Sequence, residues 1–273
     1  MSLGFSVDSL LPRARGGGQL RMGLVRLTEE QWLQSDPDLG SRRIAFAEWP
    51  EGVQLTPEAE EPGSELAAML GVDGGLAGAA LGSHEDMCLL TKREKDDQYR
   101  LIGAAVAWPS DWRPADKIGL PLRALHAPIA GYEEQLATGV DRFMETLKPG
   151  TIYGRCNWFI AATGDRRWLE QRPAVEAFAD VTPANAGETL FVRSERQTLR
   201  RLPETGAILF TIGIYVEPLA ALSPDNISRL AEAAKSLVAG EGDRRGAPAY
   251  ADALVRYADR LPHTGATIPS LPT

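Results

Sequence analysis

One of the three histidines lies in a segment that suits a ligand-binding loop. Residues 125–132 (LHAPIAGY) place His126 in a stretch bounded by Pro and Gly, just before a predicted helix, where an imidazole nitrogen could face a cavity. Neutral imidazole is a common metal ligand. Taken alone, a loop histidine is more often a structural residue with its own hydrogen-bond partners, so both interpretations stay open.

A second polar group lies in a predicted strand at residues 155–159 (RCNWF). Because side chains alternate along a strand, Arg155, Asn157 and Phe159 share one face, while Cys156 and Trp158 share the other. A guanidinium beside an amide needs a specific partner if that face is buried. The alternative is an edge strand on which Arg155 is solvated.

The most unusual segment is residues 193–201 (RSERQTLRR), which would be polar on both faces of a strand. Arg193 and Glu195 fall on one face, and Ser194 and Arg196 on the other. Such a strand suits a sheet that lines a wet or charged site, where guanidinium groups pair with the carboxylates of a ligand. The alternative is a solvated surface segment.

Several common catalytic motifs are absent from the chain. It has no phosphate loop ending in Gly-Lys-Ser/Thr, no G-x-G-x-x-G after a strand and no G-x-S-x-G elbow, which weighs against nucleotide binding and serine hydrolysis. His84, His126 and His263 lie far apart and no C-x-x-C or H-x-x-x-H occurs. A zinc site made by protein ligands alone is therefore not expected.

Five predicted strands must position these residues. Their alternating or continuous apolar patterns cover residues 86–92, 99–108, 152–162, 189–199 and 207–217. The first two strands are predicted to form a hairpin, and so are the last two, across the turn 203–206 (PETG). The sequence therefore predicts an α+β protein with an antiparallel sheet.

Helices are predicted between and after the strands. Their ranges are residues 64–81, which four glycines weaken, 133–147, 223–238 with Ser223 as its cap, and 248–261. Residues 50–63 are acidic, carry three prolines and are predicted as a surface loop. No linker or repeat divides the chain, so we expect a flexible segment over 1–21, one domain over 22–262 and a tail over 263–273.

Charge and composition limit the partners. The formal net charge is −8, so the chain as a whole repels nucleic acid. The longest apolar stretches, residues 101–108 and 207–216, are shorter than the roughly 18 residues of a membrane-spanning helix. Cys88 and Cys156 each lie in an apolar run, as buried thiols do in a reducing compartment. We therefore expect a cytoplasmic protein that binds neither nucleic acid nor membrane.

Seven short segments, in this order, carry a resemblance to a known family. They are residues 22–24 (MGL), 85–90 (EDMCLL), 108–112 (WPSDW), 117–119 (KIG), 126–132 (HAPIAGY), 155–158 (RCNW) and 195–203 (ERQTLRRLP). Together they resemble the haem-dependent oxidative N-demethylase alpha-subunit family, over about residues 22–219. The sequence departs from the family pattern at Ile129 and Ala130, where Val-Pro is typical, and at Cys156, where Asn is common.

The resemblance implies a fold and an activity. The fold is PAS-like, with a five-stranded antiparallel sheet and flanking helices that enclose haem b. The activity is oxidative demethylation of a small secondary amine such as dimethylamine, with oxygen as oxidant. Electrons come from NADPH through a partner reductase that carries the FMN and the iron–sulfur cluster, which fits the absence of nucleotide motifs here.

The resemblance also implies roles for particular residues. His126 is the only histidine inside a matching segment and is expected to be the axial iron ligand. Lys117, Arg155, Arg193 and Arg196 are the expected partners of the two propionates, and Trp158 is expected to pack on the macrocycle. Glu195 is assigned the catalytic role, as a base or as the partner of a protonated amine.

Two other interpretations remain open at this point. One is a PAS-like sensor, with haem or empty, that has no turnover. The other is an interaction protein that uses the sheet without a cofactor, for which the arginine segment would face solvent. Fold resemblance alone does not transfer an activity, and the sequence leaves the oligomeric state open.

Overall fold

The computed structural model describes residues 3–11, 22–93, 98–170, 172–237 and 241–262. It contains one seven-stranded antiparallel sheet in the order β1-β5-β6-β7-β3-β4-β2. The strands are β1 (Val25–Leu27), β2 (Val53–Leu55), β3 (Asp86–Thr91), β4 (Arg100–Ala105), β5 (Ile152–Ala161), β6 (Phe191–Arg201) and β7 (Ile208–Pro218). Among the residues outside this description are the predicted tail 263–273, which includes His263, and most of the predicted flexible segment.

The α+β class is confirmed, but the expected number of strands is wrong. All five predicted strands are present, as β3 to β7, and both predicted hairpins form: β3 pairs with β4, and β6 pairs with β7. Two three-residue strands extend the sheet, β1 beside β5 and β2 beside β4. Strands this short carry no alternation that a sequence pattern could reveal.

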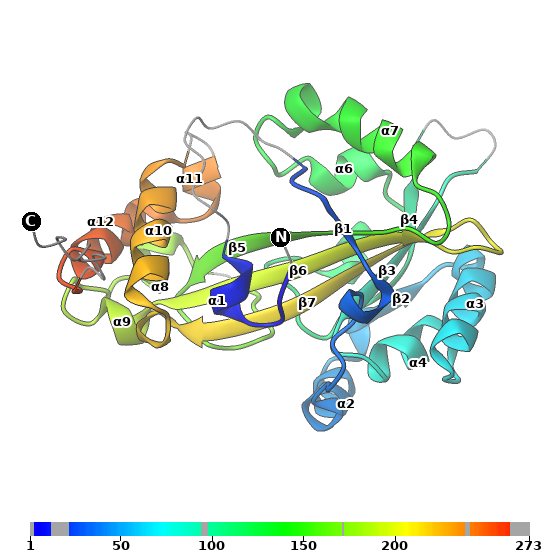
Figure 1. Ribbon diagram of the computed structural model, residues 1–273, viewed down its shortest axis with the longest axis horizontal. Coiled ribbons are helices and arrows are strands. Elements are labelled where there is room, and N and C mark those ends of the chain that lie inside the picture. Colours follow the sequence, from blue (N-terminus) through cyan, green and yellow to red (C-terminus); the bar gives the residue numbers. More distant parts are fainter. Residues whose placement is uncertain (1–2, 12–21, 94–97, 171, 238–240, 263–273) are drawn as a thin grey trace, which may run out of the picture.

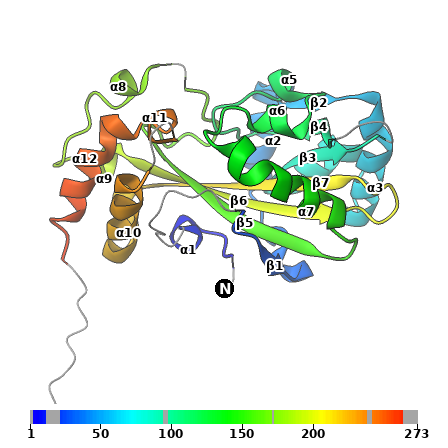
Figure 2. The same cartoon turned by 90° about the horizontal axis from the view of Figure 1, so that it is seen from above.

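Helices cover both faces and one end of the sheet. The α-helices are α1 (Val7–Leu10), α2 (Leu39–Glu48), α3 (Glu60–Leu70), α4 (Gly75–Leu81), α5 (Pro114–Lys117), α6 (Leu122–His126), α7 (Thr138–Thr146), α8 (Ala174–Ala177), α9 (Ala186–Thr189), α10 (Pro224–Lys235), α11 (Glu241–Arg244) and α12 (Ala247–Ala258). Figure 1 shows α6 and α7 on one face, α2 to α4 on the other, and α10 and α12 at the far end of β5 to β7. Figure 2 shows the same arrangement from above, with α7 across the strands.

Three apolar clusters hold these layers together. Leu76 of α4 packs with Met87 and Leu209 of the sheet, and Leu122 of α6 packs with Met144 of α7 and Ile208 of β7. The third cluster joins α10 and α12 to β5 and β6. The predicted flexible segment contains α1, whose Val7 and Leu10 are fully buried, and Val7 packs in this third cluster.

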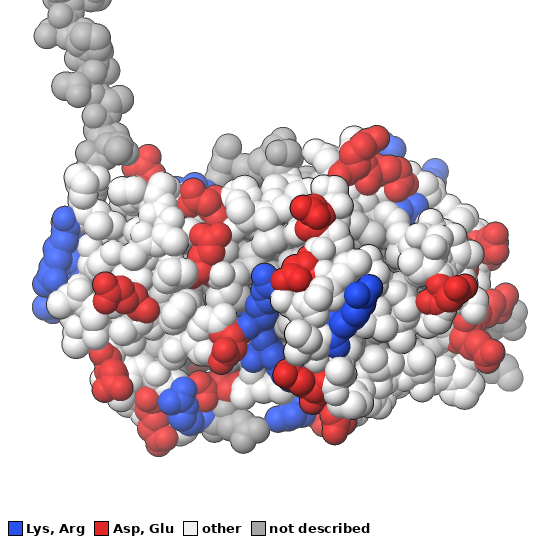
Figure 3. All heavy atoms as spheres, turned by 90° about the horizontal axis from the view of Figure 1, so that it is seen from below, with Lys and Arg blue, Asp and Glu red and all other residues white. Residues whose placement is uncertain are grey.

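The molecular surface shows no separation of charge on the face seen in Figure 3, where the described acidic and basic side chains are interspersed. Within the described ranges, no helix has both the length and the apolar composition that crossing a bilayer requires.

Candidate functional site

His126 is the last residue of α6, a short helix anchored in the core. Leu122, at its start, is buried with Met144 and Ile208, and its N–H donates to the carbonyl of Tyr99 at 2.8 Å. The five residues from Leu122 to His126 span little more than one helical turn. The prediction that His126 lies in a loop is therefore wrong, and the imidazole is positioned by a helix.

Two contacts fix the orientation of the His126 ring. Its Nδ1 lies 2.8 Å from the carbonyl oxygen of Leu122, and its plane stacks on Tyr132 with ring centroids 4.4 Å apart and 6° between planes. Gly131, at φ +76°, supplies the left-handed turn just before Tyr132. Because a carbonyl only accepts, Nδ1 carries the proton, and Nε2 of the neutral ring keeps its lone pair.

Burial lowers the pKa of His126, against the raising effect of the Leu122 hydrogen bond. The positive charges of Arg155 and Lys117 lower that pKa further. The imidazole is therefore neutral at neutral pH, as a metal ligand must be. The structure thus brings together three residues predicted from sequence: His126, Lys117 and Arg155.

Four polar side chains of β5 and β6 lie on the same face of the sheet as α6. The pairs Asn157↔Glu195 and Arg155↔Gln197 are in register, so all four side chains point to one side. Tyr153 and Leu199, two positions away on these strands, pack in the α6 cluster. The face shared by Arg155 and Asn157 is therefore the one that α6 covers.

Glu195 is oriented by two amides that donate to the same carboxylate oxygen. Gln197 Nε2 lies 2.8 Å and Asn157 Nδ2 lies 3.3 Å from Oε2, and the residue is only 6% exposed. Arg245 donates to Asn157 Oδ1 at 3.2 Å, which fixes the direction of that amide. No hydrogen bond from a described residue reaches the other oxygen, Oε1.

Arg155, in contrast to Glu195, offers a hydrogen-bond donor that has no partner in the described part of the chain. Its Nε is buried and has no hydrogen-bond partner among the described residues. Burial lowers the pKa of Arg155, while the Glu195 charge raises it and the Arg245 charge lowers it. Leaving a buried donor unpaired costs about 1–3 kcal/mol, and more for a charged group, so this side chain is suited to a bound anion.

Arg193 shares this face but uses its donors within the protein. It is fully buried and donates to Ser110 Oγ at 2.7 Å, to the Trp108 carbonyl at 2.8 Å and to the Pro109 carbonyl at 3.0 Å. Burial lowers its pKa to about 10, although the Glu195 charge acts the other way. Its visible role is to hold the segment after β4 against the sheet.

The structure does not bring Arg196 and Trp158 together with His126. Cys156 pairs with Arg196 and Trp158 pairs with Ser194, so these residues point to the opposite face. Arg196 is fully buried there and donates to the carbonyls of Trp32, at 2.9 Å, and Gln31. A porphyrin beside His126 cannot also contact these two side chains across the sheet.

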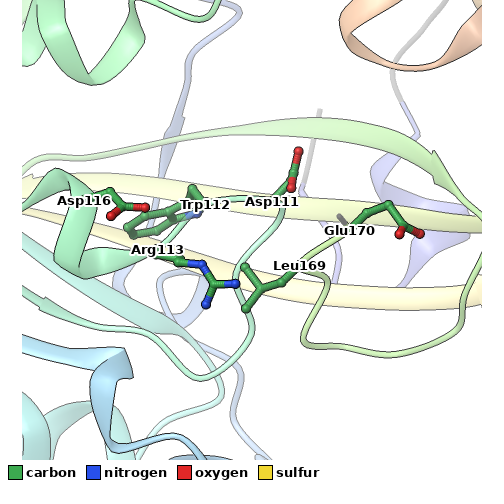
Figure 4. Close-up of a pocket in the computed structure, with 6 residues that line it drawn as sticks. All are labelled: Asp111, Trp112, Arg113, Asp116, Leu169 and Glu170. Atoms are coloured by element: carbon green, nitrogen blue, oxygen red, sulfur yellow. The ribbon is translucent and has the colours of Figure 1, made fainter. Parts of the chain in front are cut away.

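A hollow of about 290 Å³ lies in front of the strands, at the segment after β4 (Figure 4). Its lining is mainly acidic and aromatic: Asp111, Trp112, Arg113, Asp116, Leu169 and Glu170. None of the predicted site residues lines it. Trp112, which lines the hollow, also packs in the cluster that contains Leu122 of α6.

A family model described as haem-dependent oxidative N-demethylase, alpha subunit-like, matches residues 74–255, well over half of the chain. The chain belongs to this family. The match includes β3 to β7 and α6, and therefore every residue named for the site from sequence. The resemblance stated from the sequence is confirmed.

The residues near His126 fit the haem that the family name specifies. In the described part of the chain, no three His, Cys, Asp or Glu side chains converge as a metal cluster, but haem iron needs only one protein ligand. A neutral imidazole with its Nε2 lone pair available, beside Lys117 and the unpaired Arg155, offers one iron ligand and two cations for the propionates.

Sequence reasoning missed three sets of contacts around the residues that it named in this N-demethylase-like protein. Asn157 was grouped with Arg155 on one face of its strand, but the contact with Glu195 that it shares with Gln197 depends on strand register. Arg245 lies 88 residues from Asn157 and no pattern in the sequence links them. Tyr132 ends the matching segment 126–132, and that segment was the available signal for its stacking on His126.

Proposed function

We propose that this protein is a haem-dependent oxidoreductase that removes a methyl group from a small secondary amine, with haem b ligated by His126. The observation that carries the proposal is the Nδ1 hydrogen bond to Leu122, beside an unpaired guanidinium, in a member of this family. A backbone carbonyl on Nδ1 is the usual way to orient a metal-binding histidine. When bound, the haem supplies the redox chemistry of oxygen.

The chain's own residues bind and orient the reactants in this proposal. Lys117 and Arg155 neutralise the propionates, while Arg193 and Arg196 hold the segments 108–110 and 31–32 in place. Glu195 accepts a hydrogen bond from the protonated amine through Oε1, because Asn157 and Gln197 occupy Oε2. Trp158 supports the sheet from its other face instead of packing on the macrocycle.

The remaining features of the proposal are its partners and its architecture. Electrons are delivered by a separate reductase that carries FMN and an iron–sulfur cluster, since the chain has no nucleotide-binding motif. The five longer strands with their flanking helices form the PAS-like unit, and the protein acts in the cytoplasm.

Haem titration followed by an oxygen-uptake assay tests the proposal. The purified protein is titrated with haemin, and the Soret band is recorded. Oxygen consumption is then measured with dimethylamine and other methylated amines, with an artificial reductant. Haem binding with amine-dependent uptake supports the proposal. Haem binding without uptake for any amine identifies a sensor, and no haem binding overturns the cofactor assignment.

A further inference from the structure

Glu195 and Arg155 are opposite charges that lie close together without forming an ion pair. They are diagonal neighbours on β5 and β6, and the Glu195 charge raises the pKa of Arg155. No salt bridge joins them among the described residues. Two amides hold the carboxylate through Oε2 and keep it in its own position.

Each of these two side chains has hydrogen-bonding capacity that no described residue uses. Glu195 is only 6% exposed, and no described residue donates a hydrogen bond to its Oε1. Arg155 has five N–H donors, and none is matched to a described acceptor. One acceptor for a cation and one fork for an anion therefore lie side by side.

A simple alkylamine satisfies only half of this arrangement. Dimethylammonium can pair with Glu195 but leaves Arg155 without an anion. A ligand with an ammonium and a carboxylate a few bonds apart satisfies both, because a guanidinium fork matches a carboxylate in shape and charge.

We propose that Glu195 and Arg155 together bind a zwitterion, so that the amine taken by this protein is an N-methylated amino acid. Glu195 Oε1 accepts from the methylated ammonium, and the Arg155 fork donates to the carboxylate of the same molecule. This inference rests on the proposed function and narrows its substrate class. In this arrangement Lys117 pairs with one haem propionate. Because Arg155 has five N–H donors, a donor that pairs with the other propionate leaves others for the carboxylate of the substrate.

The carboxylate on Arg155 has one other source, a haem propionate, and the experiment separates the two. Binding of N-methylglycine, dimethylamine and acetate is measured by calorimetry with the haem-free and the haem-loaded protein. We expect N-methylglycine to bind at least about tenfold more tightly than either dimethylamine or acetate in both forms, as one added charged hydrogen-bonding contact provides.

Two substitutions and two matched controls assign that preference to the pair. Arg155→Met is expected to abolish the preference for N-methylglycine over dimethylamine, and Glu195→Gln is expected to weaken the binding of both amines by about tenfold. Arg142→Met and Glu134→Gln change exposed residues of the same two types and are expected to leave every affinity unchanged. Circular dichroism and melting curves show whether each variant is folded, and Arg155→Lys, which keeps a cation, is expected to retain part of the preference.

Equal affinity for N-methylglycine and dimethylamine in both forms overturns the inference. So does a preference that survives Arg155→Met. If the preference exists only without haem, the propionate occupies Arg155 and the substrate class is a plain amine, which also overturns it. A failed haem titration leaves the haem-free measurement intact, so failure of the proposed function is seen separately.

Discussion

The Nδ1 atom of His126 lies 2.8 Å from the carbonyl oxygen of Leu122, within the same short helix. This contact ties the imidazole to a backbone that Leu122 anchors in the core. It also selects the tautomer, so that a helix of five residues supplies an oriented Nε2.

Replacing His126 by Ala is expected to remove the iron ligand. Haem affinity should fall by at least about tenfold, in line with other losses at metal sites, and the Soret band should shift or disappear. Tyr132→Phe is the control, because it keeps the stacked ring and removes a hydroxyl that has no described hydrogen-bond partner. Imidazole added to His126→Gly should restore the band, and an unchanged spectrum in His126→Ala would rule out this ligand.

The stability of the protein is expected to fall in mild acid because of His84. This ring is 4% exposed, stacks on Tyr215 and lies 3.1 Å from the Ile214 carbonyl through Nε2. Burial lowers its pKa to about 4. The unfolded chain therefore binds a proton at this histidine near pH 6.5, whereas the folded chain binds it only near pH 4. The contribution of His84 to the free energy of unfolding is complete above pH 6.5 and is lost as the pH falls towards 4.

Denaturant unfolding at pH 7 and pH 4.5 measures this effect. His84 accounts for up to about 3 kcal/mol of the loss in unfolding free energy. His84→Phe keeps an aromatic ring without the titrating nitrogen, so its loss between the two pH values should be smaller. The lowered pKa of His126 acts in the same direction in both proteins. Equal pH dependence in the two proteins would contradict the assignment.

Arg42 and Asp86 form a buried ion pair on which the segment after β4 depends. Arg42 NH1 lies 2.7 Å from Asp86 Oδ1, and the same carboxylate accepts the N–H groups of Ala107 and Trp108. Arg42→Met leaves the carboxylate without its counter-charge and should cost about 3–5 kcal/mol of unfolding free energy. The neighbouring Arg43 is exposed, and Arg43→Met should change stability by less than about 0.5 kcal/mol. Similar losses in both variants would show that the buried pair is not responsible.

The strands and most helix positions follow from local patterns in the sequence. The alternation of residues 207–217 corresponds to β7, and Gly206, at φ +72°, completes the predicted turn before it. Ser223 caps α10 through the N–H of Asn226, as predicted. The glycines in the predicted helix 64–81 separate α3 from α4, with Gly71 and Gly74 both at positive φ.

The errors come from interactions between distant residues. The predicted loop 50–63 holds β2, which forms only because β4 lies beside it, and the first residues of α3. The polar segment 193–201 is neither a solvated surface nor wholly a ligand site, since Arg193 and Arg196 donate to carbonyls more than eighty residues away in the chain. The local sequence predicts the strand face on which each side chain lies. It does not show which distant residues that side chain contacts.

Gln197 is expected to position Glu195 without touching the amine. It supplies the shorter of the two contacts to Oε2, at 2.8 Å against 3.3 Å from Asn157. Gln197→Met removes that donor, so the carboxylate can rotate and present either oxygen. Amine affinity measured by calorimetry should fall by about five- to tenfold, as the loss of one contact to a charged group predicts. Gln54→Met, at the far edge of the sheet, is the matched control. Unchanged amine affinity in Gln197→Met would show that Asn157 alone orients the carboxylate.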